Sequence, residues 1–251
     1  MTVLLVMAKA PVAGLVKTRL CPPATPAQAA RIATAALLDT MDAVRATGAA
    51  GAVTPVLALA GRLTDADAYP GAAEELTVAT AGWRVLPQRG DGFADRLANA
   101  HADVAAAYPG RPVLQIGMDT PQLTGAALTA ASRALTGVDG RFTRAAAVLG
   151  RAADGGWWAL GLTDPRRAEV LRRVPMSTSH TGRDTWSALR ARGLRVAPLP
   201  VLCDVDEWPD ALAVADAVPG SRFAGQVAAV GVPALARTPV TVAMPAAGAR
   251  R

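Results

Sequence analysis

Short apolar runs alternate with longer amphipathic, alanine-rich stretches along most of this chain. Residues 3–7 are consecutively apolar, which is typical of a strand that is buried on both faces of a sheet. Further strands are predicted at residues 55–60, 83–87, 112–117, 145–149, 157–162 and 194–199. Helices are predicted at residues 25–46, 93–107, 124–135, 183–192 and 208–217. Thr25 and Thr124 stand where N-caps are expected, and Pro26 occupies a first helical position.

Strands that alternate with helices predict an α/β fold with a mainly parallel sheet covered on both faces. In such sheets ligands bind beyond the carboxyl ends of the strands. We therefore expect functional residues just after residues 7 and 117, and in the loops at Asp154 and Asp204. Residues 1–223 are expected to form one domain. The Ala- and Pro-rich segment 224–251, with almost no acidic residue, is expected to be a loosely packed tail.

Composition narrows the class of protein. The chain has 251 residues, of which 51% are apolar and only 4% aromatic, so a large core must consist mostly of Ala, Val and Leu. No run of about 18 uninterrupted apolar residues occurs, and the start does not resemble a signal peptide, so a cytoplasmic protein without a membrane partner is expected. Cys21 and Cys203 form no metal-binding pattern, which favours a reducing compartment.

The net charge of +6 does not indicate nucleic-acid binding, because the arginines are scattered and few aromatics lie among them. Lys9 and Lys17, the only two lysines, both lie in the segment MAKAPVAGLVKTRL, residues 7–20, together with Arg19. A loop that leaves a strand and enters a helix favours anions, and these side chains would add cations for phosphate groups. Gly14 is its only glycine, so the segment is neither a P-loop nor a dinucleotide-binding fingerprint. The alternative is a solvated basic loop.

Acidic residues follow two of the predicted strands. Asp119 in GMDTP, residues 117–121, could hold a divalent cation against a diphosphate, or could shape the turn before Pro121. In CDVDEWPD, residues 203–210, Asp204 and Asp206 face opposite ways if the backbone is extended, so only one is expected to point into a site. Asp206 could join Asp119 as an Mg²⁺ or Mn²⁺ ligand; the alternative is that Asp206 or its neighbour Glu207 caps the following helix.

Other polar positions are candidates for contacts to substrates. Asp154 in ADGGWW could bind an acceptor hydroxyl or take its proton while the tryptophans stack on a sugar or base; the alternative is a turn followed by core tryptophans. In the loop QRGDG and the helix that follows, Arg89, Asp91 or Arg96 could reach a nucleotide. His101 is expected to be structural, and a structural role is also favoured for His180.

Taken in order, the segments MAKAPVAGLVKTRL, GMDTP, DGGWWALGL and DVDEWPD resemble a bacterial glycosyltransferase-A-like family of the nucleotide-diphospho-sugar transferase type. That family is uncharacterised, with some members linked to arsenosugar biosynthesis, and a more distant likeness is to 2-phospholactate guanylyltransferase. The resemblance covers residues 2–215 and implies a three-layer α/β/α Rossmann-like fold that binds a nucleotide diphosphate through its first loop. It implies that Lys9, Lys17 and Arg19 meet phosphates, that Asp119 holds the metal and that Asp206 shares it. Met118 and Thr120 flank Asp119, so the sequence departs from the family pattern and has no DxD motif there.

These observations predict a metal-dependent glycosyltransferase that moves a sugar from a nucleotide-sugar to a small acceptor. In this hypothesis Asp119 and Asp154 act in catalysis, and Gly14, Asp91 and Arg96 complete the nucleotide site. Two alternatives remain open. One is a nucleotidyltransferase that joins a nucleoside triphosphate to a phosphorylated small molecule and releases pyrophosphate, and the other is a nucleotide-binding scaffold without turnover. The sequence leaves the base, the sugar, the acceptor and the oligomeric state open.

Overall fold

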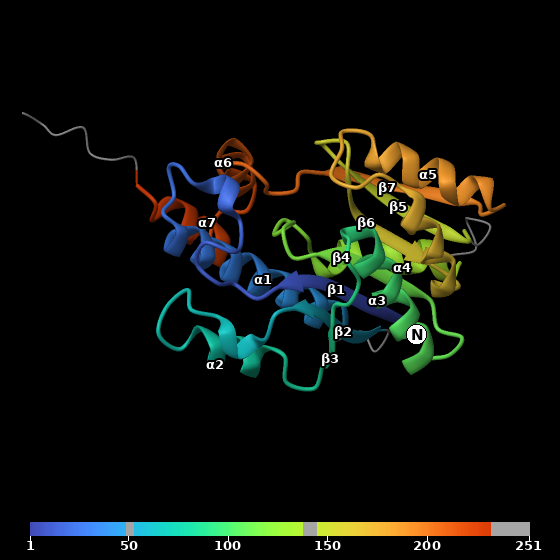
Figure 1. Ribbon diagram of the computed structural model, residues 1–251, viewed down its shortest axis with the longest axis horizontal. Helices are drawn as coiled ribbons and strands as arrows, with labels where there is room; N and C mark the ends of the chain where they lie inside the picture. Colours follow the sequence, from blue (N-terminus) through green and yellow to red (C-terminus); the bar gives the residue numbers. More distant parts are fainter. Residues whose placement is uncertain (49–52, 138–144, 232–251) are drawn as a thin grey trace, which may run out of the picture.

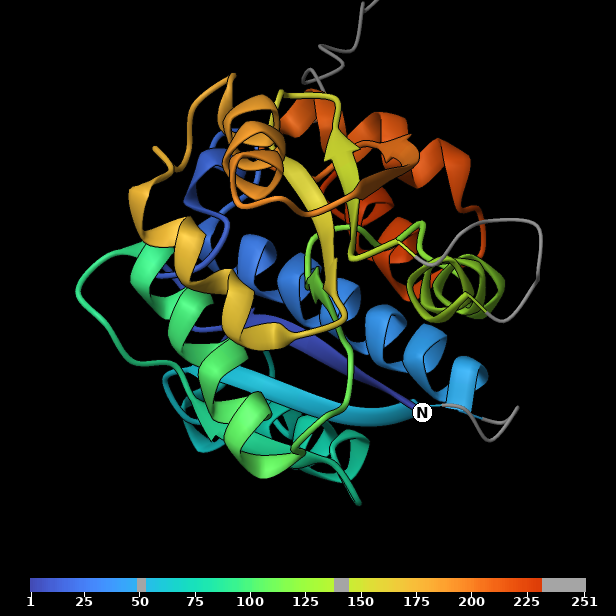
Figure 2. The ribbon, with the colours of Figure 1, turned by 90° about the vertical axis from the view of Figure 1, so that its right-hand side faces the viewer.

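A seven-stranded sheet forms the centre of the protein, with helices on both of its faces (Figures 1 and 2). The computed structural model describes residues 1–48, 53–137 and 145–231. The strands are β1 (Thr2–Lys9), β2 (Val53–Ala60), β3 (Arg84–Pro87), β4 (Val113–Gly117), β5 (Ala147–Ala152), β6 (Trp157–Leu162) and β7 (Val196–Leu202). Their spatial order is β3-β2-β1-β4-β6-β5-β7. Only β6 runs antiparallel to its neighbours, so the predicted mainly parallel α/β sheet is confirmed.

The helices divide into two layers because strand residues alternate between the faces of the sheet. Leu4 and Val6 of β1 face α1 (Pro26–Gly48), α2 (Ala72–Ala79) and α4 (Gly125–Thr136). Leu5 and Met7 face α3 (Phe93–Ala107), the 3₁₀ segment η3 (Pro165–Arg173) and α5 (Thr181–Ala191). These side chains are at most 6% exposed, as expected of a strand in the middle of a parallel sheet.

The end of the chain differs from the expected loose tail. After α6 (Trp208–Ala217) the chain forms a further helix, α7 (Arg222–Ala228), beside α1 and α6 (Figure 1). Phe223 and Val227 lie one helical turn apart and are buried in a small core shared with these helices. The boundary drawn at residue 224 therefore falls within α7, and residues 232–251 lie outside the described part of the chain. Within the described ranges, no helix combines the length and apolarity needed to cross a membrane.

One edge of the sheet collects the loops with candidate chemistry. The carboxyl ends of β1, β4, β5 and β7 meet there, and the amino end of β6 joins them because that strand is antiparallel. The loop after β1, the turn after β4, the β5–β6 hairpin and the segment after β7 are thereby brought together. These are the loops in which the sequence predicted functional residues.

Candidate active site

A cavity of about 660 Å³ opens at this edge of the sheet. Of the residues predicted from sequence, those that line it are Lys9, Lys17, Arg19, Arg96, Asp119, Asp154 and Asp206. Gly14 and Asp91 are not among its lining residues. The cavity thus combines side chains from the first loop, from α3, from the β5–β6 hairpin and from the loops after β4 and β7.

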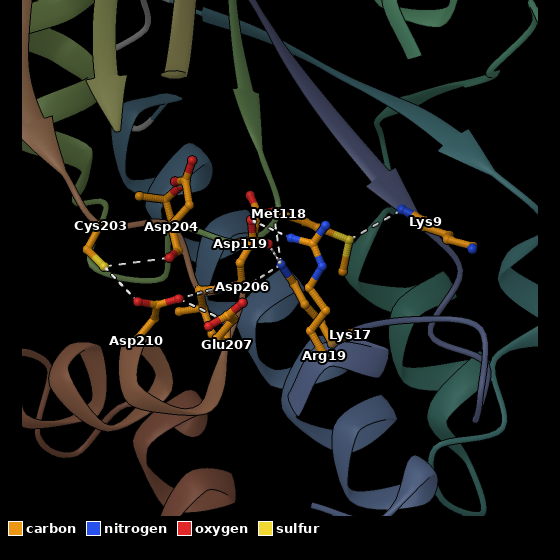
Figure 3. Close-up of polar contacts among 12 residues, drawn as sticks. Lys9, Lys17, Arg19, Met118, Asp119, Cys203, Asp204, Asp206, Glu207 and Asp210 are labelled. Atoms are coloured by element: carbon orange, nitrogen blue, oxygen red, sulfur yellow. Dashed lines mark hydrogen bonds and ion pairs between the residues drawn. The ribbon is translucent and has the colours of Figure 1, made fainter. Parts of the chain in front are cut away.

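Lys17 lies between two carboxylates inside this cavity (Figure 3). Its Nζ is 3.0 Å from Oδ2 of Asp119 and 3.2 Å from Oδ1 of Asp206. The same ammonium donates to the carbonyl oxygen of Val205 at 2.5 Å. Since an ammonium has three donors, Lys17 is fully satisfied by these oxygens.

The local backbone directs Lys17 toward these oxygens. Lys17 has φ 47° and ψ 40°, a left-handed conformation that is rare for a residue with a side chain. The 3₁₀ turn η1 (Thr18–Leu20) follows, and its Leu20 is completely buried. A left-handed residue costs about 1–2 kcal/mol, which the ion pairs and the buried Leu20 can offset. Burial by itself would lower the pKa of Lys17, but the Asp119 and Asp206 carboxylates outweigh it and raise the pKa above its usual value.

The turn after β4 orients Asp119 in a way that requires a glycine at position 117. A Cβ at Gly117 would lie 2.4 Å from Oδ1 of Asp119, far inside contact distance. The Asp119 carbonyl accepts from the Val205 amide at 2.9 Å, which ties this turn to the segment after β7. Thr120 adds a second link by donating from its hydroxyl to Oδ1 of Asp204 at 2.6 Å.

Asp204 lines the cavity along with Asp206, so the expectation that only one of them would face the site is wrong. That expectation assumed an extended strand, but β7 ends at Leu202 and residues 203–206 form a loop. Burial, and then the negative charge of Asp119, raise the pKa of Asp204 to about 8. The helix cap is Glu207 rather than Asp206, and Asp210 completes a capping box because its Oδ2 accepts from the Glu207 amide at 2.8 Å.

The other cationic side chains that line the cavity are those of Lys9, Arg19 and Arg96. The Lys9 side chain points away from Lys17, and its Nζ donates to the Leu15 carbonyl at 2.6 Å (Figure 3). The Arg19 side chain is 67% exposed, and its Nη1 lies 3.9 Å from Oδ2 of Asp206. The Arg96 guanidinium lies 5.8 Å from the centre of the Phe93 ring. Lys9, Arg19 and Arg96 thus form fewer or weaker ion pairs with carboxylates than Lys17 does.

Gln88 is a cavity residue that the sequence analysis did not single out, although it begins the candidate loop QRGDG. Its Nε2 donates to the carbonyls of Ala8 and Ala58 at 2.8 and 2.9 Å, which uses both amide hydrogens and fixes the side chain. Arg89, by contrast, forms an ion pair with Asp103 and does not line the cavity.

The β5–β6 hairpin presents Asp154 to the cavity in a fixed conformation. Oδ1 of Asp154 accepts from the Gly156 amide at 2.8 Å. Gly155 has φ +92°, and a Cβ there would lie 2.0 Å from the Ser179 carbonyl oxygen. The Gly155 carbonyl accepts from the Gly182 amide at 2.8 Å, so the hairpin is packed against the first turn of α5 as well as against the loop that precedes it.

The paired tryptophans have different surroundings. Trp157 is half-buried at the cavity wall, and its indole N–H donates to the Thr185 hydroxyl at 3.2 Å. Trp158 also lines the cavity, but it is only 3% exposed and its indole N–H donates to the Pro200 carbonyl, as expected of a core tryptophan. His180 does not line the cavity, while His101 is completely buried beneath it, as expected of a structural residue.

Asp119 and Asp206 are the residues that could hold a divalent cation. Together with the Val205 carbonyl they place three oxygens around one point, and Mg²⁺ and Mn²⁺ prefer such oxygen ligands. Among the described residues, no cluster of three or more His, Cys, Asp or Glu side chains suited to a metal is found. The donor set therefore fits a cation that is also coordinated by water or phosphate, provided that Lys17 moves aside.

Solved structures with the same fold are known. A protein from Desulfovibrio desulfuricans G20, provisionally assigned as a nucleotide-diphospho-sugar transferase, is 22% identical over 90% of this chain and 92% of its own, with a TM-score of 0.73. A cytidylyltransferase from Leptospira borgpetersenii serovar Hardjo-bovis is 11% identical over 91% of this chain and 93% of its own, with a TM-score of 0.50. The chain therefore shares the three-layer α/β/α fold of these two proteins.

The chain belongs to a family described as uncharacterized protein conserved in bacteria, DUF2064, whose model matches residues 43–178. The matched segment includes Asp119 and Asp154 but neither the first loop nor Asp206. No curated protein matches the sequence.

Proposed function

We propose that this protein is a glycosyltransferase that moves a sugar from a nucleotide-diphospho-sugar to a small acceptor. The observation that carries the proposal is the position of Lys17 between Asp119 and Asp206, at the carboxyl edge of the sheet and beside further cations. Ligands bind at this edge in open α/β sheets. A diphosphate bound beside these carboxylates would need cations to offset its charge, and the cavity supplies them.

In this proposal Lys9, Arg19 and Arg96 bind the nucleotide part of the donor. Their cationic groups line one side of the cavity and have few carboxylate partners. Gln88 lines the same cavity and its side chain is held by two hydrogen bonds, so its amide oxygen would accept from a hydrogen-bond donor on the nucleotide. Lys17 would exchange the carboxylates for phosphate oxygens when the donor binds.

Asp119 and Asp206 would hold Mg²⁺ or Mn²⁺ once Lys17 has moved. Such an ion, when bound, would stabilise the negative charge that develops on the leaving nucleoside diphosphate. The Val205 carbonyl, held in place by the backbone hydrogen bond to Asp119, is available as a further oxygen ligand. Asp204, linked to Thr120, would support the loop that carries Asp206.

Asp154 would receive the proton of the acceptor. Its Oδ1 is held by the Gly156 amide, and no described residue donates to its Oδ2. The acceptor oxygen would form a bond to the anomeric carbon of the sugar while the bond from that carbon to the diphosphate oxygen breaks. The electron pair would leave with the nucleoside diphosphate, and the acceptor proton would go to Oδ2 of Asp154.

The proposal is tested by incubating the protein and Mn²⁺ with a panel of nucleotide-sugars and, separately, nucleoside triphosphates. Mass spectrometry of the products distinguishes nucleoside diphosphate release from pyrophosphate release. We expect release of a nucleoside diphosphate, reduced at least about 100-fold in Asp119→Asn because a transition-state interaction is lost. Asp216→Asn is the matched control, since Asp216 is exposed on α6 and does not line the cavity.

Two results would contradict the proposal. Pyrophosphate release in the presence of a phosphorylated acceptor would identify a nucleotidyltransferase, an activity for which the fold shared with the cytidylyltransferase is also suited. A nucleotide that raises the melting temperature without any product would identify a binding scaffold.

A further inference from the structure

The lining of the cavity is divided by charge. The cations among its lining residues, Lys9, Lys17, Arg19 and Arg96, all come from the first loop and from α3. Across β4 from the first loop, the opposite side is formed by the β5–β6 hairpin, the loop before α5 and the first residue of α5. Its lining residues include Asp154, Trp157, Met176, Ser177, Thr178 and Thr181. None of the described residues from these segments that line the cavity is Lys, Arg or His.

The described basic residues near this side do not line the cavity, and two of them are paired with carboxylates elsewhere. Arg172 pairs with Asp95 and Glu169 at the junction of η3 and α3. Arg183 pairs with Asp184, and neither arginine lines the cavity. Of the carboxylates that line the cavity, that of Asp154 belongs to this side, whereas Asp206 is paired with Lys17. An acceptor with a phosphate or carboxylate on this side would therefore face the Asp154 carboxylate without a lining cation to balance its own charge, which costs energy in a partly desolvated site.

The polar groups of this side suit hydroxyls instead. Thr181 holds the loop in place, since its hydroxyl donates to the Pro175 carbonyl and accepts from the Thr178 amide. Thr178 in turn accepts from the His180 amide. Ser177 has φ 58°, a left-handed conformation that tends to persist where a side chain is needed in a particular place. With Oδ2 of Asp154 and the Trp157 ring, it offers a donor, an acceptor and an aromatic surface.

We infer that the acceptor is an uncharged polyhydroxyl compound, a sugar or sugar alcohol without a phosphate or carboxylate group. This inference rests on the proposed function, because it assigns the cation-rich side to the nucleotide-sugar. It also separates the two transferase hypotheses, since nucleotidyl transfer to a phosphorylated molecule needs a phosphate on the acceptor side. The loop before α5 and the β5–β6 hairpin thus determine which acceptors enter.

The test measures binding rather than turnover. The protein is saturated with GDP or UDP, whichever raises its melting temperature more, so that the cation-rich side is occupied. Saturation-transfer NMR then compares matched probes, glucose with glucose 6-phosphate and glycerol with glycerol 3-phosphate. We expect the phosphorylated member of each pair to bind at least about tenfold more weakly than the neutral one, because it meets like charge.

Variants at Met176 test whether this side of the cavity is responsible for the preference for neutral over phosphorylated probes. Met176→Lys places a flexible cation on the acceptor side and should bring the phosphorylated probes to within about threefold of the neutral ones. Met176→Leu is the matched control and should keep the wild-type preference. If Met176→Lys does not fold, the comparison of probe pairs on the wild-type protein still decides the inference.

Phosphorylated probes that bind the nucleotide-saturated protein as well as their neutral partners would overturn the inference, and so would a failure of both neutral probes to bind. These failures differ from failure of the proposed function. A wrong acceptor class leaves nucleoside diphosphate release from a nucleotide-sugar intact, whereas a protein that is not a glycosyltransferase shows no such release with any acceptor.

Discussion

Lys17 is the residue on which the chemistry of the cavity depends. Its ammonium occupies the point where oxygens of Asp119, Asp206 and Val205 converge. A lysine there keeps the carboxylates neutralised before any ligand binds, and it competes with a divalent cation for the same oxygens. Its side chain is 13% exposed, against 31% and 40% for Asp119 and Asp206, so the pairs are only partly shielded from water.

We predict that Lys17→Met binds Mn²⁺ at least about tenfold more tightly than the wild type in the absence of nucleotide. Removing the ammonium leaves Asp119 without a cation and Asp206 with only the exposed Arg19 at 3.9 Å, and this favours an added cation. The same substitution should lower the free energy of unfolding by about 1–3 kcal/mol when no metal is present, because the carboxylates lose their cation. The electron paramagnetic resonance signal of free Mn²⁺ measures the affinity.

Lys9→Met serves as the control for this prediction. Lys9 also lines the cavity, but its ammonium contacts the Leu15 carbonyl rather than a carboxylate. Its removal should leave Mn²⁺ binding within about twofold of the wild type. An unchanged or weaker Mn²⁺ affinity in Lys17→Met would mean that Asp119 and Asp206 do not form a cation site.

Single residues of the cavity were predictable where a motif follows an apolar run directly. Asp119 and Lys17 were found this way, since each belongs to a loop that leaves a recognisable strand. Asp204 was missed as a second aspartate of the cavity. Side chains point alternately to opposite faces only where the backbone is extended, and β7 ends before this segment. Gln88 was missed because its role depends on carbonyls of β1 and β2, which are distant in sequence.

At the scale of elements, the β5–β6 hairpin and the loop before α5 form a closely packed pair. Gly155 approaches the Ser179 carbonyl, and Gly182 approaches the backbone of Gly155 and Gly156. Side chains at these positions would separate the two segments. The geometry of Asp154 therefore depends on glycines that do not touch a ligand themselves.

We predict that Gly155→Ala lowers the free energy of unfolding by about 3 kcal/mol or more. The new Cβ would lie 2.0 Å from the Ser179 carbonyl oxygen, and the backbone would also be held at φ +92°. Gly14→Ala is the matched control, because Gly14 has φ +78° and its Cβ would meet no atom within 4 Å. Gly14→Ala should lower the free energy of unfolding by only about 1 kcal/mol, the cost of holding an alanine at positive φ. Urea unfolding measures both, and equal losses would refute the close packing of the two segments.

Elements were predictable where they are long or uniformly apolar. β1, β4 and β6 are buried runs, and α1 and α3 repeat apolar residues over several turns. The short α7 was missed because Phe223 and Val227 are its only buried residues, too few to establish a helical period. The segment η3 was missed because a 3₁₀ helix does not follow the α-helical repeat.

At the scale of the whole molecule, a buried titratable side chain links a helix to the sheet beneath the cavity. His101 of α3 is completely buried, and its Nε2 lies 3.0 Å from Oε1 of Gln115 on β4. Gln115 lines the cavity, so the contact joins the α3 layer to the floor of the site. Burial lowers the pKa of His101 to about 4, and the hydrogen bond to Gln115 opposes this only in part.

This buried histidine should make the whole protein less stable as the pH falls from about 6.5 to about 4. In that window the unfolded chain binds a proton at His101 and the folded chain does not, so acidification favours unfolding. The difference between 6.5 and about 4 corresponds to about 3 kcal/mol of unfolding free energy, fully lost below pH 4 and fully present above pH 6.5. Urea unfolding at a series of pH values, compared with His101→Gln, isolates this contribution from that of the carboxylates. His180→Gln, which removes the exposed histidine, should keep the wild-type slope; a wild-type slope no steeper than that of His101→Gln would show that His101 is protonated in the folded state.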